Sequence, residues 1–350
     1  MVFDSGYPGD GDPAKIAMED LVKSRQRGVA LLSTLIAVTL ITVTVIDFTA
    51  ATTLGSRIAG NQASEIRAAF LARSGVQVGL SLIMQDTRLV AQRPQPFDAL
   101  TDIWNIPLPP IPVNGGSVSV KIEDETGKLS INQLVNPVTG VLNLPFMAVL
   151  AQLFAELKLP PELLGALVDW LDRDSVPSVN GAEADFYLGL TPPYEPRNGP
   201  MPTINDLRMV RGVDDQTFVV LRQYLTAAPT AQININTAPP QVIAATLAGL
   251  GADPSMAAAI VESRLNQPFM NPAQVAQLIP NAGALTGMQT PGAGGLTPGG
   301  FGQSGSVFTT QSTFFSITGL GTYAGTRKFV YAMVARNGLS PLVLNGWHEE

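Results

Sequence analysis

The chain contains no cysteine and only one histidine, His348. Without cysteine, neither disulfide bonds nor thiolate metal sites can form. Because there is also only one histidine, the sequence argues against a transition-metal centre and against a Ser-His-Asp catalytic triad. A site for a hard cation such as calcium needs only oxygen ligands, so that kind of site stays open.

Charged residues are also scarce, at 14% of the 350 residues, and the formal net charge is −7. Proteins that bind nucleic acids usually present a basic face, so the composition points away from that class. The sequence contains no nucleophile elbow, P-loop or dinucleotide-binding fingerprint. We therefore predict that the protein is not an enzyme. The apolar share of 45% is sufficient for real hydrophobic cores, in one large domain or two.

What the sequence does have is a long uncharged run, from Val29 to Ile46, within "KSRQRGVALLSTLIAVTLITVTVIDF". A helix rises about 1.5 Å per residue, so about 20 residues cross a hydrocarbon core of roughly 30 Å. Lys23, Arg25 and Arg27 precede the run. They predict a single-pass membrane protein with its N-terminus in the cytoplasm and the bulk of the chain outside. An ordinary secretory signal peptide is the alternative, because small residues follow the run.

The stretch "RQRG" followed by "VALLSTLIAVTLI" resembles a class III signal, which prepilin peptidase cuts before the apolar run. The resemblance places the cleavage between Gly28 and Val29. Most pilin-like proteins carry Glu at the fifth position after this cut, and Ser33 stands there in this chain. A subunit with nothing ahead of it offers no partner for a carboxylate in the membrane. The missing Glu therefore fits a protein at the tip of an assembly, and drift at an unimportant position is the alternative.

Periodicity divides the rest of the chain into helical and strand-forming parts. The second half of a long helix over 29–89 has a predicted apolar face formed by Ile66, Ala69, Phe70, Val76, Leu80, Ile83 and Met84. Alternating residues predict a hairpin over 116–135, with its turn at "DETGK", and two strand-like runs over 306–321 and 327–338. Short amphipathic helices follow Pro145, and residues 281–306 have the composition of a flexible linker.

Four stretches together resemble the K subunit of type II secretion, a large minor pseudopilin. They are "RQRGVALLSTLIAV", "KIEDETGKLSINQLV", "DWLDRDSVPSVNGAEADFYLGLTPPYEPRNGPMPTINDLRMVRGV" and "ININTAPPQVIAATLAGL". The resemblance implies that the protein starts assembly at the tip of the pseudopilus, with the minor subunits I, J and H, for export across the outer membrane. It also implies methylation of the processed chain and calcium binding in the globular region.

The periodicity and the resemblance lead to one predicted fold class, α+β. We expect a pilin-like fold with a long N-terminal transmembrane helix, a small antiparallel sheet and a large all-helical inserted domain. The predicted domains are a leader that is removed (1–28), the membrane and pilin helix (29–89), a β domain (90–140 and 307–350) and the inserted helical domain (141–300) with helix-hairpin-helix-like units.

The candidate calcium ligands lie in the acidic segment 169–185. Calcium takes six to eight oxygen ligands, at about 2.3 to 2.6 Å. The predicted metal ligands are the carboxylates of Asp172, Asp174, Glu183 and Asp185. Their spacing does not match an EF-hand, so the assignment of calcium rests on the family resemblance. From the residues alone, a solvated acidic loop is the alternative.

The stretch "NINTAPPQVIAATLAGLGADPSMAAAIVESR" also resembles a DNA-binding helix-hairpin-helix. A membrane-anchored DNA-binding protein of an uptake system is therefore the second functional hypothesis. Phosphate binding of this kind usually relies on nearby cations. Residues 141–300 contain seven Lys or Arg against thirteen Asp or Glu. This balance favours a compact helical packing unit, and we expect no nucleic-acid partner.

Overall fold

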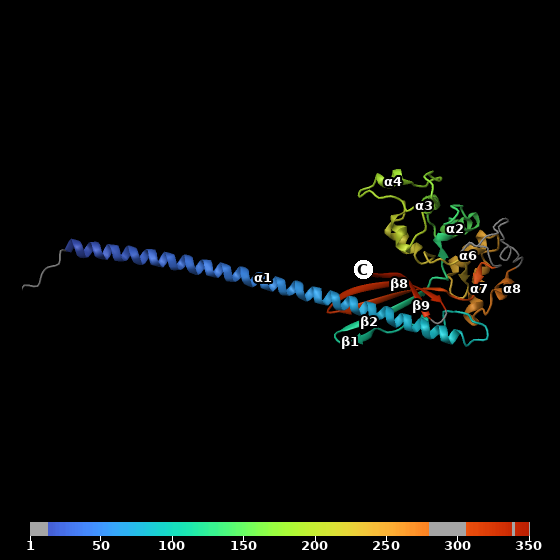
Figure 1. The fold of residues 1–350 in the computed structure, drawn as a ribbon, viewed down its shortest axis with the longest axis horizontal. Helices are drawn as coiled ribbons and strands as arrows, with labels where there is room; N and C mark the ends of the chain where they lie inside the picture. Colours follow the sequence, from blue (N-terminus) through green and yellow to red (C-terminus); the bar gives the residue numbers. More distant parts are fainter. Residues whose placement is uncertain (1–12, 280–305, 338–339, 350) are drawn as a thin grey trace, which may run out of the picture. The chain divides into compact units, whose positions relative to one another are not determined.

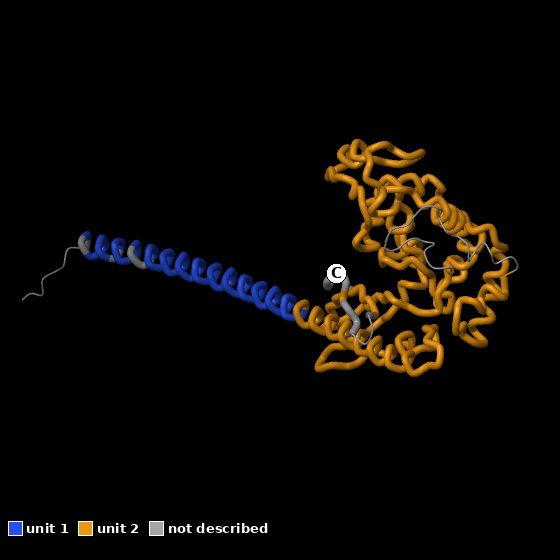
Figure 2. The backbone as a smooth tube through the Cα atoms, turned by 45° about the vertical axis from the view of Figure 1, so that its right-hand side comes forward, with its two compact units in different colours: residues 1–64 blue, residues 65–350 orange. Residues whose placement is uncertain are grey.

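The computed structural model describes residues 13–279, 306–337 and 340–349. The chain divides into two compact units, residues 1–64 and 65–350, which Figure 2 distinguishes by colour. Helix α1 (Pro13–Val90) is a continuous helix of 78 residues that belongs to both units. It therefore joins the apolar segment near the N-terminus to the folded globular part by regular secondary structure.

The first unit exposes the long apolar run on all sides of α1. Leu31 is 76% exposed and Leu35 is 61% exposed, and no part of the most apolar window is buried. The helix is long and apolar enough to cross a membrane. The hydroxyls of Thr39, Thr42 and Thr49 each donate to a main-chain carbonyl four residues earlier. Because these hydroxyls are satisfied within the helix, they fit a hydrocarbon environment.

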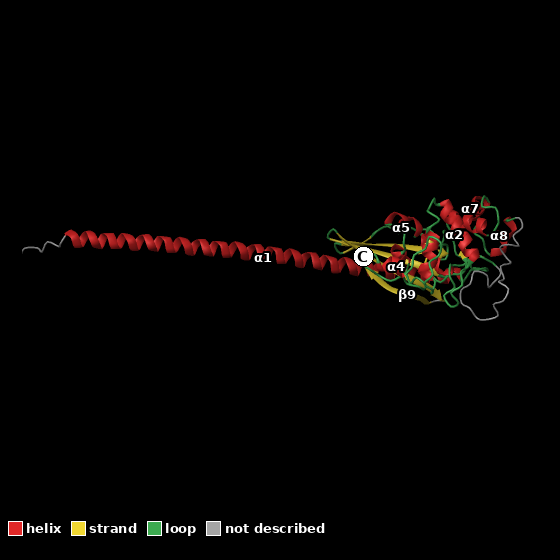
Figure 3. Cartoon of the chain, turned by 90° about the horizontal axis from the view of Figure 1, so that it is seen from above, coloured by secondary structure: helices red, strands yellow, loops and turns green. Residues whose placement is uncertain are grey.

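A five-stranded antiparallel sheet with the order β1-β2-β7-β8-β9 forms the pilin-like part (Figures 1 and 3). Its strands are β1 (Ile111–Val113), β2 (Gly116–Asp124), β7 (Phe314–Tyr323), β8 (Thr326–Asn337) and β9 (Ser340–Glu349). Neighbours β2 and β7 are distant in sequence, so the chain leaves the sheet after β2 and returns at β7. The short 3₁₀ turn η1 (Ile103–Asn105) precedes β1.

The second half of α1 packs on β7, where two glycines allow the backbones to approach closely. A Cβ at Gly319 would lie 2.1 Å from the carbonyl oxygen of Ala72, and one at Gly321 would lie 2.0 Å from that of Ala68. This core, the sheet core, consists of buried side chains from α1 and from the alternating positions of the strands. They are Ala72, Val76, Ile83, Trp104, Ile122, Phe315, Ile317, Val330, Ala332 and Val334.

The predicted apolar face of α1 was partly wrong. Val76 and Ile83 are buried as expected, but Ile66 is 58% exposed and Phe70 is 62% exposed. The reason is the close approach of the helix to β7, which requires small side chains such as Ala72 at the contact. Large side chains at the same depth have no room there, so the buried face of α1 is rotated from the predicted one.

The helical part lies between β2 and β7 in sequence and has its own core, the helical core. Its longer helices are α2 (Leu144–Glu156), α3 (Leu163–Leu171), α6 (Pro240–Gly249) and α7 (Met256–Asn266). The shorter ones are η2 (Ile131–Gln133), α4 (Ala184–Leu188), η3 (Ile204–Met209), α5 (Asp215–Leu221) and α8 (Pro272–Leu278). Helix α2 packs on α6, where a Cβ at Gly249 would lie 2.6 Å from Cα of Val149. The α+β fold class with a helical insertion is thereby confirmed.

The predicted hairpin over 116–135 was wrong. After the turn, β3 (Leu129–Ser130) pairs in parallel with β4 (Leu225–Thr226), while β2 pairs with β1 and β7. The reason is burial, since Leu129, Ile131 and other side chains after the turn enter the helical core. A second parallel pair joins β5 (Ile233–Asn234) to β6 (Phe308–Thr309). The predicted linker, 281–306, lies almost entirely outside the described residues.

Candidate metal site

The segment that connects α3 to α4 carries the predicted ligands, and glycine allows it to fold against α3. A Cβ at Gly181 would lie 1.9 Å from Oδ2 of Asp169, and a Cβ at Gly165 would lie 2.2 Å from the carbonyl oxygen of Val179. The carboxylate of Asp169, fully buried in α3, accepts a hydrogen bond from the backbone N–H of Ser178 at 3.0 Å. These contacts bring the two ends of the acidic segment together.

The folded segment gathers three carboxylates into the acidic cluster, defined here as Asp172, Asp174 and Glu183. One oxygen from each lies within 4.8 Å of the other two. Asp172 is the C-terminal cap of α3, and Glu183 is the N-terminal cap of α4. Both are buried, with 8% and 7% exposed, whereas Asp174 is exposed. The fourth predicted ligand, Asp185, is exposed in the first turn of α4 and is not part of this cluster.

The acidic cluster fits a hard cation because its buried oxygens lack partners. Oδ1 of Asp172 and both carboxylate oxygens of Glu183 have no hydrogen bond. Within the described parts of the chain, no ion pair involves any of the three carboxylates. A buried carboxylate without a partner is costly, and a calcium ion coordinated by these oxygens would remove that cost.

The raised pKa values of the two buried carboxyl groups also favour a cation at this cluster. Burial, with the neighbouring carboxylates of Asp174 and Asp169, raises the pKa of Asp172 to about 6. Burial, with the charges of Asp169, Asp172 and Asp174, raises the pKa of Glu183 to about 7. The raised values mean that the ionised form of each carboxyl lacks local compensation. A divalent cation would supply that compensation.

Sequence reasoning missed one polar side chain beside the cluster, Asn198. Its Oδ1 is buried without a partner, while its Nδ2 donates to the carbonyl oxygen of Asp174 at 3.2 Å. The backbone of Asn198 is left-handed, with φ of 48°. The Asn-Gly pair at this point in the sequence indicates a turn, but nothing in it shows that the turn meets the acidic segment.

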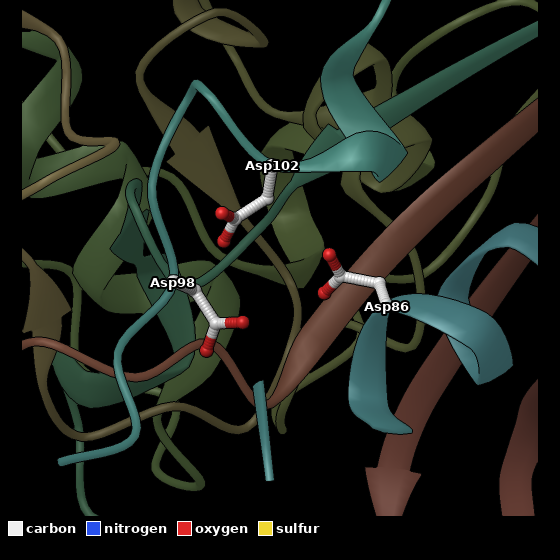
Figure 4. Close-up of side chains that lie close together, drawn as sticks. All are labelled: Asp86, Asp98 and Asp102. Atoms are coloured by element: carbon white, nitrogen blue, oxygen red, sulfur yellow. The ribbon is translucent and has the colours of Figure 1, made fainter. Parts of the chain in front are cut away.

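A second group of carboxylates, Asp86, Asp98 and Asp102, has the same spacing but a different chemistry. Figure 4 shows the three side chains turned toward a common centre, and one oxygen from each lies within 4.8 Å of the others. Arginines already supply positive charge here. Arg336 pairs with Asp86 at 2.9 Å and also with Asp98, and Arg93 pairs with Asp102 at 2.6 Å. This group is therefore an ion-pair network rather than a candidate metal site.

Comparison with known proteins shows which family the chain resembles. Residues 127–230 and 233–293 match two family models described as type II secretion system (T2SS), protein K. Type II secretion system protein K of Pectobacterium carotovorum is 30% identical over 226 residues, covering 62% of this chain and 68% of the relative. The chain belongs to the type II secretion system protein K family. The corresponding Pseudomonas aeruginosa protein is 29% identical over 268 residues, which cover 75% of this chain and 79% of that protein.

A solved structure agrees on the fold. The crystal structure of the GspK-GspI-GspJ complex from the type 2 secretion system of enterotoxigenic Escherichia coli contains a chain similar to this one, with a TM-score of 0.62 and 19% identity. The match covers 83% of this chain and 99% of that chain.

The family resemblance inferred from the four sequence motifs is confirmed. The protein is therefore a minor pseudopilin of type II secretion, anchored by an N-terminal apolar helix. Family membership decides between the two functional hypotheses in favour of the pseudopilin.

Proposed function

We propose that this protein starts the assembly of a type II secretion pseudopilus and stays at its tip, supporting export across the outer membrane. The observation that carries the proposal is Ser33, at the fifth position after the expected cleavage between Gly28 and Val29. The hydroxyl of Ser33 donates to the carbonyl oxygen of Val29 at 2.8 Å, within its own helix. A side chain satisfied in this way needs no partner from a subunit ahead, as a leading subunit requires.

The proposed topology rests on the same helix. Prepilin peptidase removes residues 1–28, the helix from Val29 to about Phe48 crosses the inner membrane, and the globular part lies in the periplasm. The cations before Gly28 support this orientation. The chain similar to this one occurs in a complex with GspI and GspJ. The proposed partners are the minor subunits I and J, which that complex contains, and H, which the family resemblance implies.

Calcium is the proposed cofactor, held by the acidic cluster of Asp172, Asp174 and Glu183. The unpartnered oxygens of Asp172 and Glu183 support the assignment. The ion binds the two ends of the segment between α3 and α4 to one another. Its role is structural, since it orders a long polar segment of a chain that has no cysteine for a disulfide staple.

The tip position is tested by labelling. A C-terminal affinity tag on the chain, detected with gold particles on isolated pseudopili, should mark one end of each fibre. The same tag on a major pseudopilin is the matched control and should mark the whole length. Gold distributed along the fibre from this chain would overturn the tip assignment, whatever the outcome for calcium.

A further inference from the structure

The five-stranded sheet has a second face, opposite the one on which α1 packs. Ile317 of β7 and Val330 of β8 point into the sheet core beneath α1. Because side chains alternate along a strand, Thr318, Phe329 and Tyr331 point to the other side. Thr318 and Tyr331 are direct partners in the register of β7 and β8. This second face therefore carries polar and aromatic side chains that the sheet core does not use.

A cavity of about 320 Å³, called the cleft here, lies between the second face of the sheet and the helical part. Ser316 lies at its closed end and is 3% exposed, whereas Phe329 lies at its open end and is 42% exposed. The volume is at the lower end of the range for binding sites and holds one or two side chains of a ligand. On the helical side, the lining includes Ile204 of η3, Leu225 of β4 and Arg222, which caps α5.

Four of the five charged side chains that line the cleft compensate one another. Lys128 pairs with Glu125 at 2.9 Å and with Glu123 at 3.1 Å, and Lys121 also pairs with Glu123. The fifth charged side chain is that of Arg222. Among the residues that the structure describes, no ion pair involves Arg222. The lining therefore has one uncompensated positive charge.

No carboxylate of the neighbouring helices is free to neutralise Arg222. Burial raises the pKa of Tyr331, and the positive charge of Arg222 opposes that rise, so the guanidinium lies close to this phenol on the sheet. The other charged side chains of η3 and α5 have partners of their own, Asp206 with Arg197 at 3.6 Å and Arg208 with Asp215.

A second arginine without an ion pair lies on the same face of the sheet. Arg327 precedes Tyr331 by four residues on β8, so both side chains point to one side and their backbone positions are about 13 Å apart. Arg327 is exposed, and no described residue forms an ion pair with it. Phe329 lies midway, beside Leu320 of β7 in the register. Two positive charges thus flank an exposed apolar platform.

We propose that the cleft and this face bind an extended acidic segment of a partner protein. One carboxylate of the segment pairs with Arg222, an apolar side chain packs on Phe329 and Leu320, and a second carboxylate pairs with Arg327. An extended chain rises about 3.3 Å per residue and alternates its side chains. The three groups therefore come from positions i, i+2 and i+4 of the segment, which together span about 13 Å.

The arrangement favours a peptide segment over other occupants. A single small anion cannot reach both arginines, and it makes no use of the apolar platform of Phe329 and Leu320. Arginine binds a carboxylate through two parallel hydrogen bonds, which suits Asp and Glu side chains. Two copies of a chain with a net charge of −7 repel each other, so a different protein is the expected source. The proposal does not depend on the tip position or on calcium.

The test uses the full chain in micelles of a non-ionic detergent, with empty micelles as the blank. The probe is a rhodamine-labelled peptide with the sequence Gly-Glu-Ser-Leu-Ser-Glu-Gly, followed by fluorescence anisotropy. It should bind saturably at low salt and more weakly at high salt, because exposed charges are screened. A peptide with Gln for both Glu residues should bind at least about tenfold more weakly, as should one with Ser for Leu.

Variants of the chain identify the binding face. Arg222→Gln and Arg327→Gln should each weaken binding about tenfold, and Phe329→Ser should weaken it as well. Arg222→Lys should retain part of the affinity, because it keeps the charge but loses the paired hydrogen bonds. The matched control is Arg88→Gln, at an exposed position of α1, which packs on the other face of the sheet. It should bind like the parent, and all variants should keep the parent's melting temperature because these positions are exposed.

Four results would overturn the proposal. The first two are the absence of saturable binding up to millimolar peptide, and equal binding of the glutamine peptide. The third is unchanged affinity in both Arg222→Gln and Arg327→Gln. The fourth is complete displacement of the peptide by millimolar phosphate at equal ionic strength, which would reduce the cleft to a site for small anions. Self-association of the parent that both arginine variants abolish, without peptide binding, would assign the face to a second copy of the chain instead.

Discussion

Removing the charges of the acidic cluster should distinguish the cost of burying its carboxylates from the stability that bound calcium would add. The double variant Asp172→Asn/Glu183→Gln keeps the size of both side chains but removes both buried charges. In the presence of a chelator, it should be more stable than the parent, because burial and mutual repulsion raise the pKa of both carboxyls in the parent. In the presence of calcium, the order should reverse, because neutral amides coordinate calcium more weakly than carboxylates.

The size of the calcium effect follows from binding linkage. A ligand that binds only the native state adds about 2.7 kcal/mol at a hundredfold excess over Kd. For a domain of this size, about 1 kcal/mol corresponds to roughly 2 to 4 °C in Tm, so calcium should raise the melting temperature of the parent by about 5 to 10 °C. Magnesium should substitute poorly, because it requires a tight octahedron and retains its waters.

Protons should compete with calcium at the same oxygens. Since the pKa of Glu183 is raised to about 7 in the absence of an ion, the affinity for calcium should fall as the pH drops below 7. Titrations of the full chain by calorimetry, at several pH values, measure this dependence directly.

The control lies in the same segment. Asp185 is exposed and outside the acidic cluster, so Asp185→Asn should retain the full calcium shift in melts of the full chain. If Asp185→Asn lost the shift and Asp172→Asn/Glu183→Gln kept it, the assignment of ligands would be wrong. Identical melts in chelator, calcium and magnesium would leave the segment as a solvated acidic loop.

The remaining predictions concern α1. Gly28→Glu should block processing, because a bulky charge replaces glycine at the peptidase cut, and N-terminal sequencing that still began at Val29 would contradict this. Ser33→Glu should impair secretion or leave it unchanged in a complementation assay, since the new carboxylate has no partner ahead, so improved secretion would refute the tip argument. Gly319→Ala should destabilise the globular part by about 1 to 3 kcal/mol, because its Cβ would lie 2.1 Å from the carbonyl oxygen of Ala72. An unchanged denaturation midpoint would show that α1 does not approach β7 as described.

The periodic pattern of apolar residues was sufficient to predict elements in which buried side chains recur at regular spacing. The alternation of Val330, Ala332 and Val334 predicted one buried face of β8, and all three side chains are fully buried. The same reasoning failed for Phe70 on α1, which is exposed. A periodic pattern identifies apolar side chains but not the distance to the surface on which they pack. The glycines of β7 determine that distance, and they lie some 250 residues away in sequence.

The hairpin shows the corresponding limit for strands. The turn after β2 was predicted correctly, but a turn does not specify which strand follows as a partner. The side chains of Leu129 and Ile131 are buried in the helical core. Strand β2 pairs with β7 at nine positions, from Gly116 to Asp124. Both preferences involve residues far along the chain, so the local sequence could not reveal them.

The two carboxylate groups explain why a count of acids is a poor guide to a metal site. Asp172, Asp174 and Glu183 lie between α3 and α4, and Asp86, Asp98 and Asp102 lie in α1 and the segment after it. Both groups are short in sequence, and both bring one oxygen of each carboxylate within 4.8 Å of the others. The two groups differ in whether an arginine pairs with their carboxylates. Arg336 reaches the second group from β8, a strand remote in sequence. Within the described residues, no ion pair reaches the first group, and its buried oxygens stay unpartnered. The same concentration of negative charge is therefore balanced by arginines in the second group, whereas the first group has the unpartnered oxygens on which the proposal of a calcium site rests.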